Sequence, residues 1–165
     1  MLIYPDTVGK KNLNRILNTT LDDAINEKLK VDVLSNSINK IGFNTQVSTY
    51  PSNLYDSPDA IKDLASCDIL LGCVDSEDGR RLLNQIATFY LIPYFDLGVK
   101  ILADGNGGIE QICSTIHYIK PGAGSLKSRS VYTDEELRAA GLLRIDLDEY
   151  NKQKRVRIYC QCASR

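Results

Sequence analysis

The feature that most constrains the fold is an uninterrupted apolar run, DILLGCV at residues 68–74, which has the length of a strand. A strand that is apolar on both faces is typical of a parallel sheet covered by helices on both sides. Residues 28–41 and 82–90 carry apolar side chains at helical spacing before and after this run. The alternation predicts an α/β sheet with crossover helices, in which the run is the central strand and Cys73 is buried.

The other elements follow from similar patterns. Strands are predicted at residues 1–4, 45–50, 94–102 and 110–119, the last two joined by the turn-forming ADGNGG. A helix with a serine cap and a proline at its first position is predicted at 57–66, and another at 133–141 within an otherwise irregular stretch from about 122 to 150. His117, the only histidine, lies in a predicted strand, where a packed or edge position is favoured over a catalytic base.

Composition excludes several classes of partner. The chain has 165 residues, enough for one domain with a core, and its net charge of −1 offers no basic surface for nucleic acid or anionic lipid. It contains no apolar run near eighteen residues and no signal-peptide pattern at its start. The five cysteines are odd in number and lack paired CxxC spacing, which favours reduced thiols in a cytoplasmic protein.

The junction after the central strand is the first candidate site. Asp75 follows the strand directly, and ligands of parallel sheets bind at the carboxyl ends of strands, beside helix N-termini. A carboxylate there could hold Mg²⁺ that bridges phosphates, while Arg80 and Arg81 offset phosphate charge. The alternative interpretation is that Asp75 or Ser76 only caps the next helix and that the arginines are solvated.

Four motifs follow one another over residues 1–150. The stretch CDILLGCVDSEDGRRLLNQIATFYLIPYFDLG carries a strand-ending aspartate, an arginine five residues later and an LN pair, here Asp75, Arg80, Leu83 and Asn84. PDTVGKKNLNR fits the pattern D-x-V-x-x-x-N-L-x-R, with Asp6, Val8, Asn12, Leu13 and Arg15 in place. Lys30 opens a predicted helix, and YIKPGAGSL begins at the end of the last predicted strand. In this order the four motifs resemble those of the ThiF/MoeB/HesA adenylyltransferases, relatives of the ubiquitin-activating enzymes, with Lys30 at the position of the family's phosphate-contacting lysine and YIKPGAGSL similar to the stretch before the crossover loop.

The resemblance implies ATP- and Mg²⁺-dependent adenylation of the C-terminal carboxylate of a ubiquitin-like protein or peptide, with release of pyrophosphate, by a cytoplasmic homodimer. Asp75 and Arg15 would be catalytic, and Asp75 would hold Mg²⁺ through ATP. The nucleotide would be bound by Asp6, Asn12, Arg15, Lys30, Asp75 and Arg80. The alternatives are that Lys30 is a solvated helix residue and Arg15 a surface ion-pair partner.

The chain departs from the family in identifiable places. It lacks the opening strand and the glycine-rich GxGGxG turn, and the arginine lent by a partner subunit from before that turn is missing too. Tyr4 stands where an aspartate would bind the ribose, Ser125 stands where many relatives have cysteine, and no CxxC pairs remain for zinc. The expected fold is therefore an α/β, Rossmann-like, mostly parallel sheet with flanking helices, truncated at the first βα unit, and we expect the chain as given to be inactive.

The domain is expected to end near residue 150, and residues 151–165 form an irregular tail. Codons compatible with KRVRIYCQCAS, read one base over, can encode NEYGYIVNVH, which is consistent with a frameshifted or truncated end. The competing interpretation is a metal or redox pair at Cys160 and Cys162. For the whole chain, the alternatives to adenylation are a non-catalytic binding or assembly module derived from the family and a dinucleotide-binding oxidoreductase fragment, which is disfavoured because no nicotinamide-specific feature is present.

Overall fold

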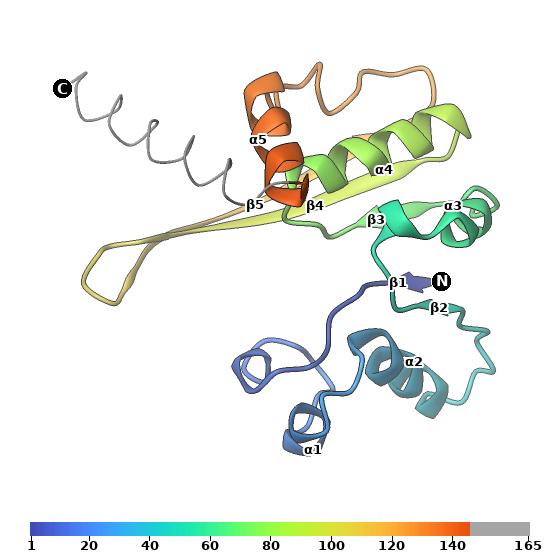
Figure 1. Ribbon diagram of the computed structural model, residues 1–165, viewed down its shortest axis with the longest axis vertical. Coiled ribbons are helices and arrows are strands. Elements are labelled where there is room, and N and C mark those ends of the chain that lie inside the picture. Colours follow the sequence, from blue (N-terminus) through green and yellow to red (C-terminus); the bar gives the residue numbers. More distant parts are fainter. Residues whose placement is uncertain (146–165) are drawn as a thin grey trace. The chain divides into compact units, whose positions relative to one another are not determined.

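A computed structural model describes residues 1–145 of the chain (Figure 1). The chain divides into two compact units. The first unit is Met1–Ser66 and the second begins at Cys67. The tail at 151–165, with Cys160 and Cys162, lies outside the described residues, as does the predicted domain end near 150. Each unit is described by itself below.

The first unit contains a short parallel strand pair. Strand β1 (Leu2–Ile3) pairs with β2 (Thr49–Tyr50), so both predicted strands exist but are only two residues long. Two backbone hydrogen bonds hold this pair together, from the N–H of Leu2 to the carbonyl oxygen of Ser48 at 2.8 Å and from the N–H of Tyr4 to that of Tyr50 at 3.1 Å. Helix α3 (Pro58–Leu64) follows the 3₁₀ turn η2 (Leu54–Asp56) and starts with the predicted proline, although the hydroxyl of Ser57 makes no capping bond.

Helix α2 (Lys30–Lys40) confirms the helix predicted at 28–41. It ends before Gly42, whose φ of 85° is a left-handed conformation that glycine adopts without steric cost. Val33 of α2 packs with Val8 and Ala24 in a small buried cluster, against which Leu13 also lies. This cluster holds together α2, the short helix α1 (Leu21–Ile25) and the 3₁₀ turn η1 (Lys10–Asn12).

A capping box fixes the start of α1. The Thr20 hydroxyl accepts a hydrogen bond from the N–H of Asp23 at 3.2 Å, and the Asp23 carboxylate accepts one from the N–H of Thr20 at 2.8 Å. The same carboxylate accepts hydrogen bonds from the Thr20 hydroxyl and from Lys28 Nζ. Hydrogen bonds from Thr20 and Lys28 lower the pKa of the Asp23 carboxyl group from 3.8 to about 2.

The second unit is built on a three-stranded sheet in the order β3-β4-β5. Strand β3 (Leu70–Gly72) runs parallel to β4 (Tyr94–Ala103), which forms a long antiparallel hairpin with β5 (Ile109–Ile119). Helix α4 (Glu77–Phe89) connects β3 to β4 and packs on both, and α5 (Asp134–Ile145) packs against α4 (Figure 1). The parallel pairs and flanking helices confirm the predicted α/β class.

The prediction that the run at 68–74 forms a central strand with a buried Cys73 is wrong. Among the described strands, β3 lies at the edge of its sheet and pairs only with β4, and Cys73 is exposed. Leu70 and Gly72 are buried on the face that α4 covers, whereas Leu71 on the opposite face is 69% exposed. The apolar run therefore reflects a sheet face that no described helix of this unit covers.

The asparagine of the LN pair, Asn84, has a structural role in α4. Its side chain is buried, and Oδ1 accepts a hydrogen bond from the N–H of Leu126 at 3.0 Å. Leu126 is itself fully buried, in the segment that follows β5. A buried backbone N–H needs a partner, so Asn84 ties this segment to the helix.

The pKa of Asp23 predicts a specific response to acid. Because the pKa in the folded chain, about 2, lies below the ordinary 3.8, the unfolded chain takes up the proton first as the pH falls. The contribution of Asp23 to stability is therefore complete above about pH 4 and is lost toward pH 2. We expect the difference in thermal unfolding midpoint between the unaltered chain and Asp23→Asn to narrow over this interval.

The matched control is Asp32→Asn, which removes one exposed carboxylate from α2. A difference for Asp23→Asn that stays constant from pH 5 to pH 2 would contradict the assignment.

Candidate functional site

Asp75 lies on the turn that connects β3 to α4. The N-cap of α4 is the next residue, Ser76, whose hydroxyl accepts a hydrogen bond from the N–H of Gly79 at 3.2 Å. A Cβ at Gly79 would lie 2.8 Å from the Ser76 hydroxyl oxygen, so glycine allows this close approach. Asp75 is exposed, and within the described part of the chain its carboxylate makes no hydrogen bond or ion pair. Ser76 therefore caps the helix, and the Asp75 carboxylate remains available to a ligand.

A buried ion pair holds this turn against the sheet. Asp96, on β4, is fully buried, and its carboxylate accepts hydrogen bonds from Tyr94 Oη at 3.0 Å and from Arg80 Nη1 at 3.1 Å. Arg80 also donates through Nε to the carbonyl oxygen of Val74 at 3.2 Å. Its side chain is only 18% exposed. Arg80 thus connects the residue before Asp75 to a buried carboxylate, so the interpretation of Arg80 as solvated is wrong.

Two glycines make room for this cluster. A Cβ at Gly72 would lie 2.7 Å from Tyr94 Oη, and one at Gly98 would lie 2.7 Å from Arg80 Nη2. Either contact is closer than a real Cβ accepts, so a larger residue at either position would displace the cluster. Burial, with the neighbouring Asp96 charge, also raises the pKa of Tyr94 well above its ordinary value. The phenol therefore stays protonated and keeps donating to Asp96.

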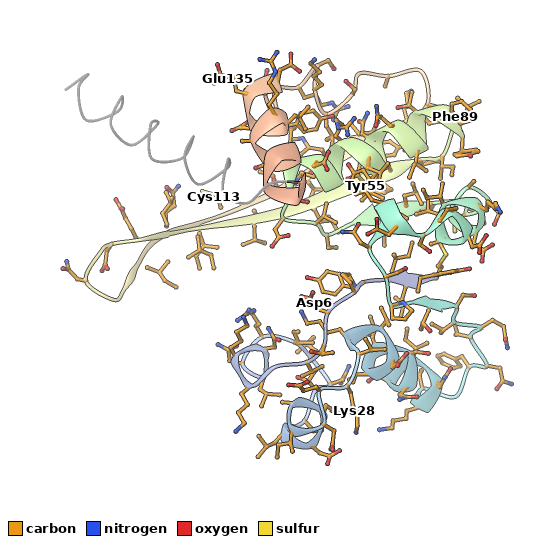
Figure 2. All side chains as sticks on the ribbon, in the orientation of Figure 1. Asp6, Lys28, Tyr55, Phe89, Cys113 and Glu135 are labelled. Atoms are coloured by element: carbon orange, nitrogen blue, oxygen red, sulfur yellow. The ribbon has the colours of Figure 1, made fainter. Side chains whose placement is uncertain are left out.

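In the first unit, the structure brings Lys30 and Asp6 together. Lys30 Nζ lies 3.0 Å from Asp6 Oδ2 and 4.7 Å from the centre of the Tyr4 ring, and the Lys30 N–H donates to the Asp6 carbonyl oxygen at 3.0 Å. Asp6 lies on the segment that follows β1 (Figure 2). The Lys30 side chain is 17% exposed, so it is not the solvated helix residue of the alternative interpretation. Its ammonium group is held at the start of α2 between the Asp6 carboxylate and the Tyr4 ring.

Asn12 and Arg15 belong to the turn at η1. Asn12 is buried, and its Oδ1 accepts a hydrogen bond from the N–H of Gly9 at 3.0 Å, so this side chain stabilises the turn itself. Arg15 is exposed and donates through Nη1 to the carbonyl oxygen of Lys11 at 2.9 Å. No ion pair among residues 1–145 includes Arg15, which leaves most of its guanidinium donors open.

The predicted site residues therefore fall into two groups. Asp6, Asn12, Arg15 and Lys30 lie in the first unit, and Asp75 and Arg80 lie on one turn of the second. Sequence reasoning missed Asp96 and Tyr94, which determine what Arg80 contacts. The signal was present in YFDLGV, where a carboxylate interrupts an apolar strand and therefore needs a charged partner when buried.

The described residues contain no group of three or more His, Cys, Asp or Glu side chains that could hold a metal ion. An exposed single carboxylate such as Asp75 fits the way Mg²⁺ is held beside phosphates, through one or two carboxylates and water. Over the same residues, no helix has the length and hydropathy needed to span a membrane.

The buried ion pair predicts a large loss of stability when Arg80 is removed. Arg80→Met leaves the Asp96 carboxylate buried without its charged partner, which typically costs about 3–5 kcal/mol. We expect urea unfolding to show a loss of this size. The control, Arg138→Met, removes an exposed arginine from α5 and should change stability by less than about 0.5 kcal/mol. If both substitutions lowered stability equally and only slightly, the buried Asp96 carboxylate would not need Arg80 to stabilise it.

Comparison with known proteins now places the chain. The model of the ThiF family matches residues 1–127. A curated relative, the adenylyltransferase and sulfurtransferase UBA4 of Meyerozyma guilliermondii, is 29% identical over 93 residues, which are 56% of this chain and 21% of that protein. The chain thus spans about a fifth of the length of the curated relative.

Solved structures of MccB share the fold. Escherichia coli MccB with ATP superimposes with a TM-score of 0.54 and 18% identity over 90% of this chain and 47% of its own. The microcin C7 biosynthetic enzyme MccB in complex with N-formylated MccA gives a TM-score of 0.57 and 19% identity, over 81% of this chain and 36% of its own. The structural likeness supports the predicted Rossmann-like fold, and the family match over residues 1–127 shows that this chain belongs to the ThiF family.

Proposed function

We propose that this chain is part of an enzyme that uses ATP to adenylate the C-terminal carboxylate of a ubiquitin-like protein or a peptide. The observation that carries the proposal is the position of Asp75, a carboxylate left open at the carboxyl end of β3 because Ser76 caps α4. Membership of the ThiF family supports the reaction type. A relative named as an adenylyltransferase and solved structures of MccB with ATP and with MccA support a nucleotide and a peptide or protein as reactants.

The reaction defines what the site residues must do. An oxygen of the substrate carboxylate bonds to the α-phosphorus of ATP, and the bond from that phosphorus to pyrophosphate breaks. Negative charge grows on the leaving pyrophosphate, so fixed cations beside it lower the barrier. Lys30 suits this role because Asp6 and Tyr4 hold its ammonium group in place, and Arg15 suits it because its guanidinium is exposed. Arg15 is accordingly proposed as a catalytic residue that contacts the phosphates.

Asp75 is the proposed second catalytic residue and the ligand of the metal. It would hold Mg²⁺ together with the ATP phosphates. Mg²⁺, when bound, offsets the phosphate charge. The Arg80–Asp96 ion pair holds the backbone of the residue before Asp75, so the turn that carries Asp75 is held in place before the nucleotide arrives. Contact between Arg80 and the nucleotide stays a prediction, since the side chain already binds Asp96 and the Val74 carbonyl oxygen.

The oligomeric state, the cellular location and the kind of substrate are also proposed from the family. The enzyme would act as a homodimer in the cytoplasm on a small protein or peptide that presents a free C-terminus. The 165 residues contain no GxGGxG sequence, whose backbone N–H groups would bind phosphate. We therefore expect ATP–pyrophosphate exchange in the product of the gene's full reading frame, and little or none in the 165-residue chain assayed alone.

The test of the proposed function is Asp75→Asn in the product of the full reading frame. The substitution removes a ligand charge from the Mg²⁺ site but keeps the shape of the side chain, so we expect pyrophosphate exchange to fall by at least about tenfold. The thermal unfolding midpoint should not change, because Asp75 is exposed and does not cap α4.

The matched control is Asp68→Asn, which removes an exposed carboxylate from the opposite end of the same strand. This variant should exchange pyrophosphate at the rate of the unaltered enzyme. An active enzyme in which Asp75→Asn changes exchange no more than Asp68→Asn would overturn the assignment of Asp75.

A further inference from the structure

The turn between β4 and β5 is open to solvent. The strand ladder ends at the pair Ala103↔Ile109, so residues 104–108, with the sequence DGNGG, have no strand partner. All five residues are exposed. In Figure 1 the turn lies at the end of the hairpin that points away from α4 and α5. The side chains of this turn are therefore in contact with water.

Asn106, in this turn, is the only asparagine of the 165 residues that glycine follows. Asparagine is among the chemically unstable residue types, and proteins adapted to high temperature contain fewer of them. The backbone nitrogen of the next residue can attack the asparagine side chain, and a side chain on that next residue hinders the attack. Glycine has no Cβ, so Gly107 leaves the approach open.

The hydrogen bonds of the turn leave both reacting groups free. Asp104 Oδ1 accepts hydrogen bonds from the N–H of Asn106 at 2.8 Å and from the N–H of Gly108 at 2.9 Å. Within residues 1–145, neither the carboxamide of Asn106 nor the N–H of Gly107 makes a hydrogen bond. Gly107 has a φ of 91°, and a Cβ built there would meet no atom within 4 Å. The peptide between Asn106 and Gly107 is thus neither bonded nor crowded.

We propose that Asn106 is a site of spontaneous deamidation. The backbone nitrogen of Gly107 loses its proton to solvent and bonds to Cγ of Asn106. The bond from Cγ to the carboxamide nitrogen breaks, and that nitrogen leaves as ammonia. Water then opens the resulting succinimide ring at either carbonyl, which yields aspartate or isoaspartate. The whole reaction consumes one water and releases one ammonia, without an oxidant, a reductant or a cofactor.

The products change the turn in a way that follows from its hydrogen bonds. Isoaspartate carries the main chain through Cγ, which lengthens the path between the two N–H groups that Asp104 binds. Both products also place a new carboxylate two residues from that of Asp104. The turn lies at the opposite end of β4 from Asp96, so we expect the Arg80–Asp96 ion pair to be unchanged.

The test is incubation of the folded 165-residue chain at mildly alkaline pH, with samples taken over several days. We expect peptide mass spectrometry to show the amide of Asn106 replaced by an acid in a growing fraction of molecules. A protein isoaspartate methyltransferase should label the same peptide. Hydroxylamine cleaves succinimides and should cut the folded chain into residues 1–106 and 107–165. Asn106→Ser should abolish this cut and the deamidated peptide.

The matched control moves the same pair of residue types into a helix. Ser37→Gly gives Asn36, which is also exposed, a glycine neighbour inside α2, where helical hydrogen bonds engage the backbone N–H groups. In this variant Asn106 should deamidate at least about tenfold faster than Asn36, because the helix must open before the ring can close. A second measurement needs no variant. Asn106 should react in the folded chain within about threefold of its rate in urea, since the turn has little to unfold.

These measurements have outcomes that would overturn the proposal. One is an Asn106 that stays intact in the folded chain while it reacts in urea. Another is deamidation of Asn36 and Asn106 at equal rates in folded Ser37→Gly, which would mean that the turn contributes nothing beyond the dipeptide. No measurement here involves ATP, so each leaves the pyrophosphate exchange assay to decide the proposed reaction.

Discussion

The second unit depends on one buried carboxylate. Asp96 has no contact with solvent, its charge is paired with that of Arg80, and it accepts a hydrogen bond from the Tyr94 hydroxyl. The partners come from different elements, since Arg80 lies on α4 and Tyr94 on β4. Because a buried charge is costly when unpaired, this contact sets where α4 docks on the sheet, and the bond from Arg80 to the Val74 carbonyl carries that constraint to the turn before α4. The position of the turn that carries Asp75 therefore depends on the packing of α4 on the sheet.

Periodicity in the sequence was sufficient to find α2, α4 and the long strands, but it did not predict the short helix α1. Apolar spacing located α2 and α4, Gly42 ended the first of them, and the turn ADGNGG divided β4 from β5. Periodicity could not say whether the apolar residues on both sides of β3 were covered. Leu71 is as apolar as Leu70, yet only Leu70 faces a helix of its unit, and this depends on the tertiary arrangement. The expectation of a buried Cys73 was wrong for the same reason.

The candidate site was predictable in its residue types but not in its pairings. The resemblance to the ThiF family singled out Asp6, Lys30, Asp75 and Arg80 in register, and the family match supports that resemblance. It did not indicate that Lys30 binds Asp6 or that Arg80 binds Asp96, which are contacts between residues 24 and 16 positions apart. Such pairings depend on distances that only the folded chain fixes. The caps of α4 show the same limit, because Asp75 and Ser76 are both good capping residues and geometry selects Ser76.

The bond between Asn84 and Leu126 has a consequence for the order in which the second unit forms. It joins residues 42 positions apart, and the chain between them includes β4, the hairpin turn and β5. Closing so large a loop is entropically costly until the hairpin has shortened the path between its ends. We therefore expect the segment around Leu126 to gain its native contact late, after α4 and the hairpin are in place. Completion of this bond would report that the segment after β5 has docked on α4, which gives amide exchange at Leu126 particular value as a kinetic probe.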